Sequence, residues 1–105
     1  MPHAYADVLC SCGYNQKYHC SSHDDGGFLQ EFTCNDFRIS VLKRTQSSFP
    51  LCFNQLAGLC FDITCRQCRK EQYIKYGAKT FGKKRRNEYY ECCGKKLSFH
   101  FNWEH

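Results

Sequence analysis

The last segment of the chain, LSFHFNWE, alternates large apolar side chains with polar ones. The apolar positions are Leu97, Phe99, Phe101 and Trp103. A period of two with bulky groups on a single face is typical of a half-buried β-strand. We therefore predict a strand here whose aromatic face packs into the core. The seam of a homodimer is the alternative use of that face.

Elsewhere the pattern predicts one further strand and two short helices. FRISVL alternates, with Phe37, Ile39 and Val41 on one face. In SSFPLCFNQLAG, proline suits the first turn of a helix and glycine suits its end. A second helix is predicted from Gln67 to Tyr76, before Gly77. Strands together with helices predict an α+β fold.

The length of 105 residues predicts a single domain over 1–105. A polar stretch, KRTQSSFP, divides it into an acidic or neutral half, 1–48, and a basic half, 49–105. A chain this short buries a modest core and depends on cross-links. The sequence supplies ten cysteines for them.

The N-terminal residues indicate how these cysteines are used. MPHAYADVLCSCGYNQ has neither the basic start nor the apolar run of a signal peptide, and no window approaches the length of a membrane span. We therefore expect an intracellular protein that makes no membrane contact and whose reduced cysteines bind metal. The alternative is an extracellular mini-protein held together by disulfides.

Cys65-Arg-Gln-Cys68 is a C-x2-C unit, a spacing that turns two sulfurs toward one ion. Cys92 and Cys93 follow after 23 intervening residues and complete a tetrahedral set. We predict one structural Zn²⁺ on these four cysteines. Disulfides or buried thiols are the alternative.

Cys92 and Cys93 are adjacent, so they point to opposite faces of a strand unless the backbone turns between them. Gly94 offers that turn at low strain. Without the turn, one of the pair leaves the site and Cys60 or His100 completes it.

A second Zn²⁺ site is a candidate in the N-terminal half. Its proposed ligands are Cys10, Cys12, Cys20 and His23, with His19 and Cys34 as substitutes. No tight spacing pattern supports this set. The alternative is that several of these cysteines fill the core.

Charge divides the chain unevenly. Residues 66–96 hold eleven Lys or Arg against three acidic residues, a net charge of +8, whereas the rest holds four basic and seven acidic residues, a net charge of −3. This asymmetry indicates a polyanionic partner for the basic part. The candidate contacts are Arg66, Arg69, Lys70, Lys83, Lys84, Arg85, Arg86, Lys95 and Lys96.

The run KKRR, residues 83–86, has three interpretations. It is a solvated loop, a nuclear or nucleolar import signal, or a segment that binds the phosphates of RNA. Nearby aromatic residues offer stacking surfaces for unpaired bases, namely Tyr73, Tyr76, Phe81, Tyr89 and Tyr90. We expect backbone recognition with little sequence preference. The sequence contains no nucleophile elbow, P-loop or H-E-x-x-H motif, so we expect no enzyme.

The segment from Cys65 to Cys93, with its cysteines and the run GKKRRNE, resembles the small cysteine-rich proteins of positive-strand RNA plant viruses. The benyvirus suppressors of RNA silencing are the suggested group. In the carlavirus proteins the basic run precedes the C-x2-C unit, whereas here it follows Cys68. The resemblance implies a viral zinc-finger protein of the host cytoplasm and nucleus, with Lys83–Arg86 as a nucleolar localisation signal.

Together these observations predict a suppressor of host RNA silencing that binds RNA through residues 66–96. The alternative within the host cell is a zinc-stabilised interaction module. It would dock a host silencing or nuclear factor, and the basic run would serve only as an address.

Overall fold

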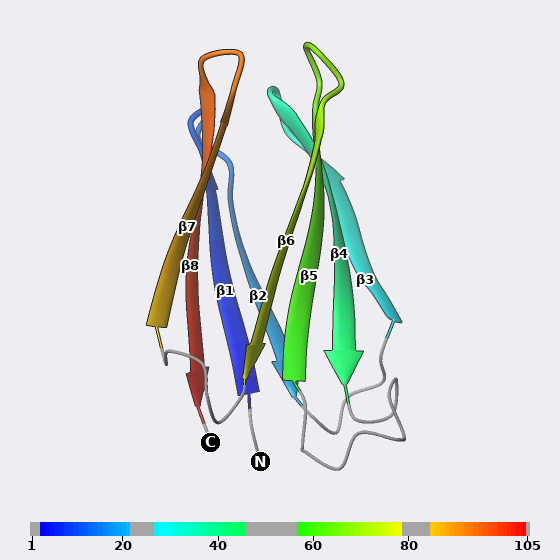
Figure 1. Ribbon diagram of the computed structural model, residues 1–105, viewed down its shortest axis with the longest axis vertical. Helices are drawn as coiled ribbons and strands as arrows, with labels where there is room; N and C mark the ends of the chain where they lie inside the picture. The colour runs from blue at the N-terminus through cyan, green and yellow to red at the C-terminus, as the bar shows by residue number, and fades with distance from the viewer. Residues whose placement is uncertain (1–2, 22–26, 46–56, 79–84, 105) are drawn as a thin grey trace.

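The computed structural model describes residues 3–21, 27–45, 57–78 and 85–104, and these form eight β-strands (Figure 1). The strands are β1 (His3–Cys10), β2 (Asn15–Ser21), β3 (Gly27–Thr33), β4 (Phe37–Thr45), β5 (Ala57–Cys65), β6 (Glu71–Ala78), β7 (Arg85–Cys92) and β8 (Lys95–Glu104). They build two antiparallel four-stranded sheets. Sheet A has the order β2-β1-β8-β7 and sheet B the order β3-β4-β5-β6.

The predicted α+β class is wrong, because the described part of the chain is all-β. The segment predicted as a helix from Gln67 to Tyr76 is instead a turn followed by β6. In β6, Ile74 and Tyr76 are buried while Tyr73 and Lys75 are exposed. That alternation fits β6 as the strand beside β5. The helix predicted within SSFPLCFNQLAG falls on residues outside the described ranges, except that its last two residues begin β5.

Both predicted strands are confirmed, as β4 and β8. Leu97, Phe99 and Phe101 of β8 are fully or almost fully buried, and Trp103 packs partly against them. The aromatic face of β8 therefore belongs to the core of the chain itself.

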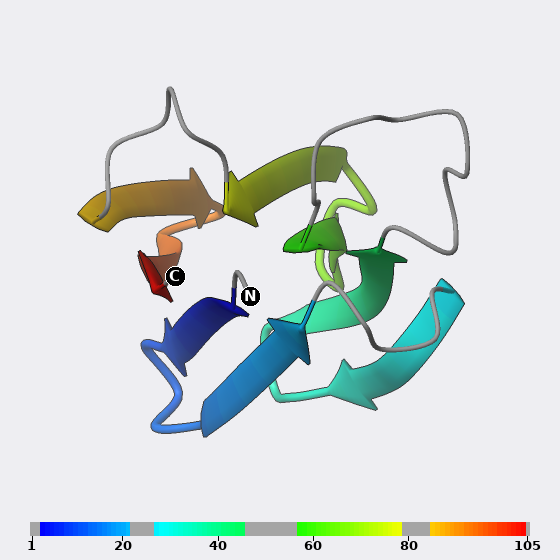
Figure 2. The same ribbon diagram turned by 90° about the horizontal axis from the view of Figure 1, so that it is seen from below.

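The two sheets face each other and enclose the core (Figure 2). Phe61 of β5 lies at its centre, with no exposed surface. Its ring centroid lies 5.3 Å from that of Phe99 and 5.9 Å from that of Phe101, both in sheet A. Aromatic packing of this kind joins the sheets through large buried areas. A search of the described ranges found no helix with the length and apolar character of a membrane span.

The four hairpin turns within the described ranges lie at one end of the sandwich, and both termini lie at the other (Figure 1). These turns join β1 to β2, β3 to β4, β5 to β6 and β7 to β8. We call this the turn end. Residues far apart in the sequence meet here, and most of the described cysteines are among them.

Candidate metal centre

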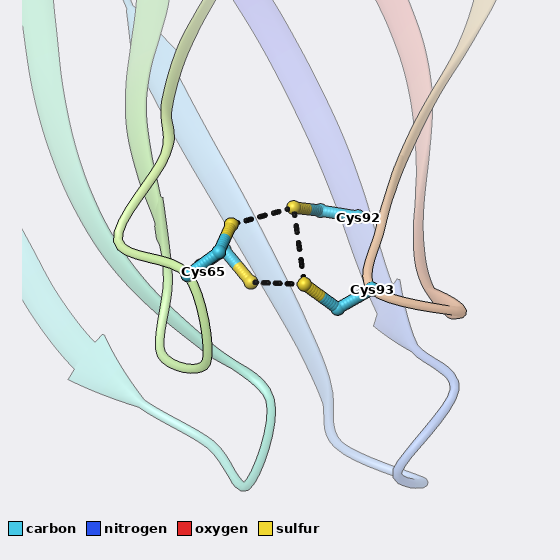
Figure 3. Close-up of side chains that lie close together, drawn as sticks. Cys65, Cys92 and Cys93 are labelled. Carbon is cyan, nitrogen blue, oxygen red and sulfur yellow. Dashed lines mark hydrogen bonds between the residues drawn. The ribbon is translucent and has the colours of Figure 1, made fainter.

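Four cysteines from two hairpins come together at the turn end. Cys65 ends β5 and Cys68 lies in the turn that follows, whereas Cys92 ends β7 and Cys93 lies in the next turn. Their four sulfurs all lie within 4.8 Å of one another. Figure 3 shows Cys65 facing the Cys92–Cys93 pair across the gap between the hairpins. The structure thus brings together the four residues that the sequence predicts as zinc ligands.

The spacing of the sulfurs fits a tetrahedral metal. The Sγ–Sγ distances are 3.8 Å for Cys65–Cys93, 3.8 Å for Cys92–Cys93 and 3.2 Å for Cys68–Cys92. Four sulfurs bound to zinc at about 2.3 Å lie about 3.8 Å apart at tetrahedral angles. None of these four cysteines is in a disulfide. The cluster could therefore hold a metal ion.

The turn between β7 and β8 explains how adjacent cysteines face one site. Cys92 pairs with Lys95, so Cys93 and Gly94 form a two-residue turn. Both have positive φ, 54° and 75° respectively. Positive φ at both central positions defines a type I′ turn, which suits the twist of a hairpin. The predicted turn at Gly94 is confirmed, and Cys93 shares its left-handed conformation.

The C-x2-C turn places backbone N–H groups around one sulfur. The N–H groups of Cys68 and then Gln67 donate to the Cys65 sulfur and lower the pKa of Cys65 to about 6. By contrast, hydrogen bonding with Cys68, Cys65 and Cys92 raises the pKa of Cys93 to about 12. Without metal, a thiolate is thus favoured at Cys65 over one at Cys93. A thiolate preformed near neutral pH favours capture of a soft cation.

A second cluster consists of Cys10, Cys12 and Cys34, whose sulfurs also lie within 4.8 Å of one another. Cys34, which the sequence offers only as a substitute, takes the place predicted for Cys20. Cys20 is fully buried beside Ala4, near the opposite end of β1. His23 lies outside the described residues.

The other substitutes for the two sites lie away from the clusters. Cys60 precedes Cys65 by five positions in β5 and so points to the opposite face of the strand. His100 lies on the exposed face of β8, with Nδ1 2.9 Å from Asn87 Oδ1. His19 lies on β2 with Nε2 2.9 Å from His3 Nδ1.

The basic residues fall into two groups. Arg66, Arg69, Lys70, Lys95 and Lys96 are exposed at the turn end. Arg85 and Arg86 begin β7, whereas Cys92 ends it, and this strand spans about 23 Å at 3.3 Å per residue. Lys83 and Lys84 are outside the described ranges. The two described residues of the KKRR run, Arg85 and Arg86, are therefore far from the cysteine pair rather than in one loop with it.

The two arginines of the run differ in their surroundings. Arg85 is exposed. Arg86 Nη2 donates to the backbone oxygen of Lys75 at 2.5 Å, and its Nε lies 3.2 Å from Glu88 Oε1. Its guanidinium carbon also lies 5.3 Å from the centroid of the Tyr76 ring. The contacts of Arg86 are therefore with the protein itself, and its side chain is less available than that of Arg85 to bind RNA.

Only two of the five predicted stacking residues are available at the described surface. Tyr89 is 55% exposed and Tyr73 is 45% exposed. Tyr76 is buried against Phe101, with ring centroids 4.7 Å apart, and Tyr90 packs against the core. Phe81 belongs to the residues that the structure does not describe.

Comparison of the chain with protein-family models, with curated proteins and with solved structures gave no match in any of the three.

Proposed function

We propose that the protein is a zinc-stabilised β-sandwich that binds single-stranded RNA on the outer face of the β7–β8 hairpin. One observation carries the proposal. Tyr89 projects from edge strand β7 with 55% of its surface exposed, and Lys96 Nζ lies 4.5 Å from its ring centroid. An exposed ring beside a cation fits a base stacked on the tyrosine with its phosphate near the lysine.

The rest of this outer face supports the same interaction. Cross-strand pairs place polar groups side by side along the hairpin: Arg85 with Asn102, Asn87 with His100, Tyr89 with Ser98, and Glu91 with Lys96. Amide and imidazole groups hydrogen-bond to base edges, and the arginine and lysine contact phosphates. The RNA strand would run along β7.

Charge favours contact along the hairpin over contact at the turn end alone. A zinc ion with four thiolates carries a net charge of about −2. The basic residues of the turns offset that charge first. Further positive charge lies at the other end of the hairpin, where Arg85 begins β7 and follows Lys83 and Lys84 in the sequence. Backbone contacts spread in this way imply little sequence preference.

The biological role that we propose is suppression of RNA silencing in a host cell, by holding RNA away from the silencing machinery. The support is the resemblance carried by residues 65–93, together with the RNA surface inferred here. The run at residues 83–86 would also act as a nuclear or nucleolar address.

Replacing Tyr89 with Ala should weaken binding of single-stranded RNA by about 5- to 150-fold, because one stacked base contributes about 1–3 kcal/mol. Tyr73→Ala is the matched control. Tyr73 is a comparably exposed tyrosine on sheet B, where it pairs with Asp62. Fluorescence anisotropy with a labelled oligonucleotide measures both affinities. Equal losses in the two variants, or no loss in either, would contradict the proposed surface.

The triple variant Lys83→Ala, Lys84→Ala, Arg85→Ala tests the basic run without touching Arg86. Removing three phosphate contacts should reduce the slope of log affinity against log salt by about two units for single-stranded RNA. An unchanged slope together with lost nuclear accumulation would show that the run is an address only. That result would favour the protein-docking alternative.

A further inference from the structure

The cluster of Cys10, Cys12 and Cys34 has no part in RNA binding as proposed above. We propose that these three cysteines bind a second zinc ion, with an oxygen ligand in the fourth position. Cys10 ends β1 and Cys12 lies in the next turn, both in sheet A, whereas Cys34 follows β3 in sheet B.

The sulfur positions support this site. Cys34 Sγ lies 3.5 Å from Cys10 Sγ, and all three sulfurs lie within 4.8 Å of one another. Two thiolates on one zinc ion lie about 3.8 Å apart. The backbone N–H of Cys12 also points to Cys10 Sγ, at an N–S distance of 3.5 Å. Such a contact stabilises a thiolate that binds metal.

The turns that carry these cysteines are held by backbone hydrogen bonds. Cys10 N–H donates to the Tyr14 oxygen at 2.8 Å, and Gly13 N–H donates to the Cys10 oxygen at 2.9 Å. Gly13 has a φ of 99°, which glycine adopts without strain. On the facing hairpin, Cys34 N–H donates to the Phe37 oxygen at 2.9 Å. Little backbone ordering is therefore left for metal binding to impose.

Asp36 is placed to supply the fourth ligand. Its Oδ2 lies 3.7 Å from Cys10 Sγ, and about 3.6 Å is expected between a sulfur and an oxygen on one tetrahedral zinc. The carboxylate lies outside the tight group of three sulfurs, so it reaches the ion by rotation of its side chain. Its exposed fraction is only 11%, and Lys95 Nζ is 3.9 Å away.

The alternative is that these cysteines are core residues that bind no metal, and it explains the cluster less well than a zinc site does. Cys10 and Cys34 are 7% exposed, and two buried sulfurs would fill that space. Cys12, however, is half-buried, yet its sulfur lies with the other two rather than in solvent. A third sulfur gathered at the rim of the core is typical of a metal site.

The second site gives the turn end a symmetrical set of cross-links. The first cluster joins the β5–β6 hairpin of sheet B to the β7–β8 hairpin of sheet A, and the second joins β1–β2 of sheet A to the β3–β4 turn of sheet B. Arg66, next to Cys65, connects them. Its Nη1 donates to the Cys34 oxygen at 2.7 Å, and its backbone N–H donates to the Asp36 oxygen at 3.1 Å. In each pair of facing hairpins, one zinc ion would therefore join a hairpin of sheet A to a hairpin of sheet B.

The two sites differ in ligand set, and this difference is measurable. Four thiolates enclose an ion fully, whereas three thiolates and a rotating carboxylate leave one side open to a competing ligand. We expect a chelator to remove the zinc of the second site first.

Elemental analysis and native mass spectrometry of protein purified with zinc and a reductant test the proposal. We expect two zinc ions per chain in the wild type, one in Cys34→Ser and two in Cys20→Ala. Cys20 is the matched control, because it is a buried cysteine of sheet A that lies away from both clusters. One zinc in the wild type that survives in Cys34→Ser would overturn the second site.

Alkylation of the wild type covers the case in which Cys34→Ser does not fold. Zinc should protect both Cys12 and Cys68 from a thiol reagent, and a limiting amount of chelator should expose Cys12 first. Cys12 alkylation that is independent of zinc, or a Cys10–Cys34 disulfide under reducing conditions, would overturn the proposal. RNA binding by the Tyr89 and Tyr73 variants is a separate readout, so failure of either proposal leaves the other testable.

Discussion

Removing zinc with a strong chelator should abolish the cooperative thermal unfolding of the protein, and adding zinc back should restore it. Structural zinc contributes about 10–16 kcal/mol to the folding of small zinc-finger peptides at neutral pH. The total stability of a single domain is only about 5–15 kcal/mol. The free energy lost with the metal is therefore as large as the whole net stability of a typical domain.

The positions of the clusters explain why the loss spreads beyond the turns. The first cluster holds edge strand β7 of sheet A beside edge strand β6 of sheet B through their adjoining turns. Without the metal, nothing at the turn end joins the β5–β6 hairpin of sheet B to the β7–β8 hairpin of sheet A through these four sulfurs. A sandwich of this size has little further core with which to hold its sheets together.

Circular dichroism against temperature, on protein stripped of metal and then given Zn²⁺ or Mg²⁺, measures the effect. Magnesium is the control ion, because it prefers oxygen ligands and should restore nothing. Cys20→Ala should respond to zinc as the wild type does. Protein that contains no zinc and no free thiol, and whose unfolding transition the chelator leaves unchanged, would instead support the disulfide alternative.

The sequence predicts strands where bulky apolar residues alternate, and misses strands that lack them. β4 and β8 alternate Phe, Ile, Val or Leu with polar residues, so both were predicted. In β1 the buried positions are Ala4, Ala6, Val8 and Cys10, small groups that give a weak periodic signal. β7 has half-buried positions but none that is fully buried, as expected of an edge strand, and its charges conceal the pattern.

The same distinction separates the two metal clusters. Cys65 with Cys68 is a local pair set by one turn, and Cys92 with Cys93 is another, so spacing alone identified both halves of the first site. The second site needs Cys34 from the other sheet beside Cys10 and Cys12. Which hairpin faces which depends on sheet packing, and no short-range spacing encodes it. Sequence proximity therefore favoured Cys20, which β2 carries to the far end of the sheet.

The KKRR run shows a third limit, because two adjacent arginines have different roles. Alternation along β7 turns Arg85 to solvent and Arg86 toward the edge of the core. From the sequence alone, Arg85 and Arg86 are both predicted to contact RNA. The structure describes Arg86 as half-buried, over the rings of Tyr76 and Phe101 at 5.3 Å and 5.4 Å.

Replacing Arg86 with Ala should therefore lower the free energy of unfolding by about 2–4 kcal/mol, whereas Arg85→Ala should change it by less than about 0.5 kcal/mol. Arg86 Nη2 bonds the Lys75 oxygen, which ties β7 of sheet A to β6 of sheet B where the two sheets share no ladder. Its removal leaves a backbone acceptor without its charged donor and uncovers two rings.

Urea denaturation of zinc-loaded protein measures the free energy of unfolding of both variants. RNA titration in the same buffer measures their affinity for RNA. Arg85→Ala should weaken RNA binding while keeping wild-type stability.

Arg86→Lys separates the effect of charge from that of geometry. A lysine keeps the positive charge but lacks the planar guanidinium that contacts both the Lys75 oxygen and the two rings. If Arg86→Lys is as stable as the wild type, a positive charge alone is enough to stabilise the contact between β7 and β6. If Arg86→Ala retains full stability but loses RNA binding, the arginine belongs to the RNA surface and the division of roles along β7 is wrong.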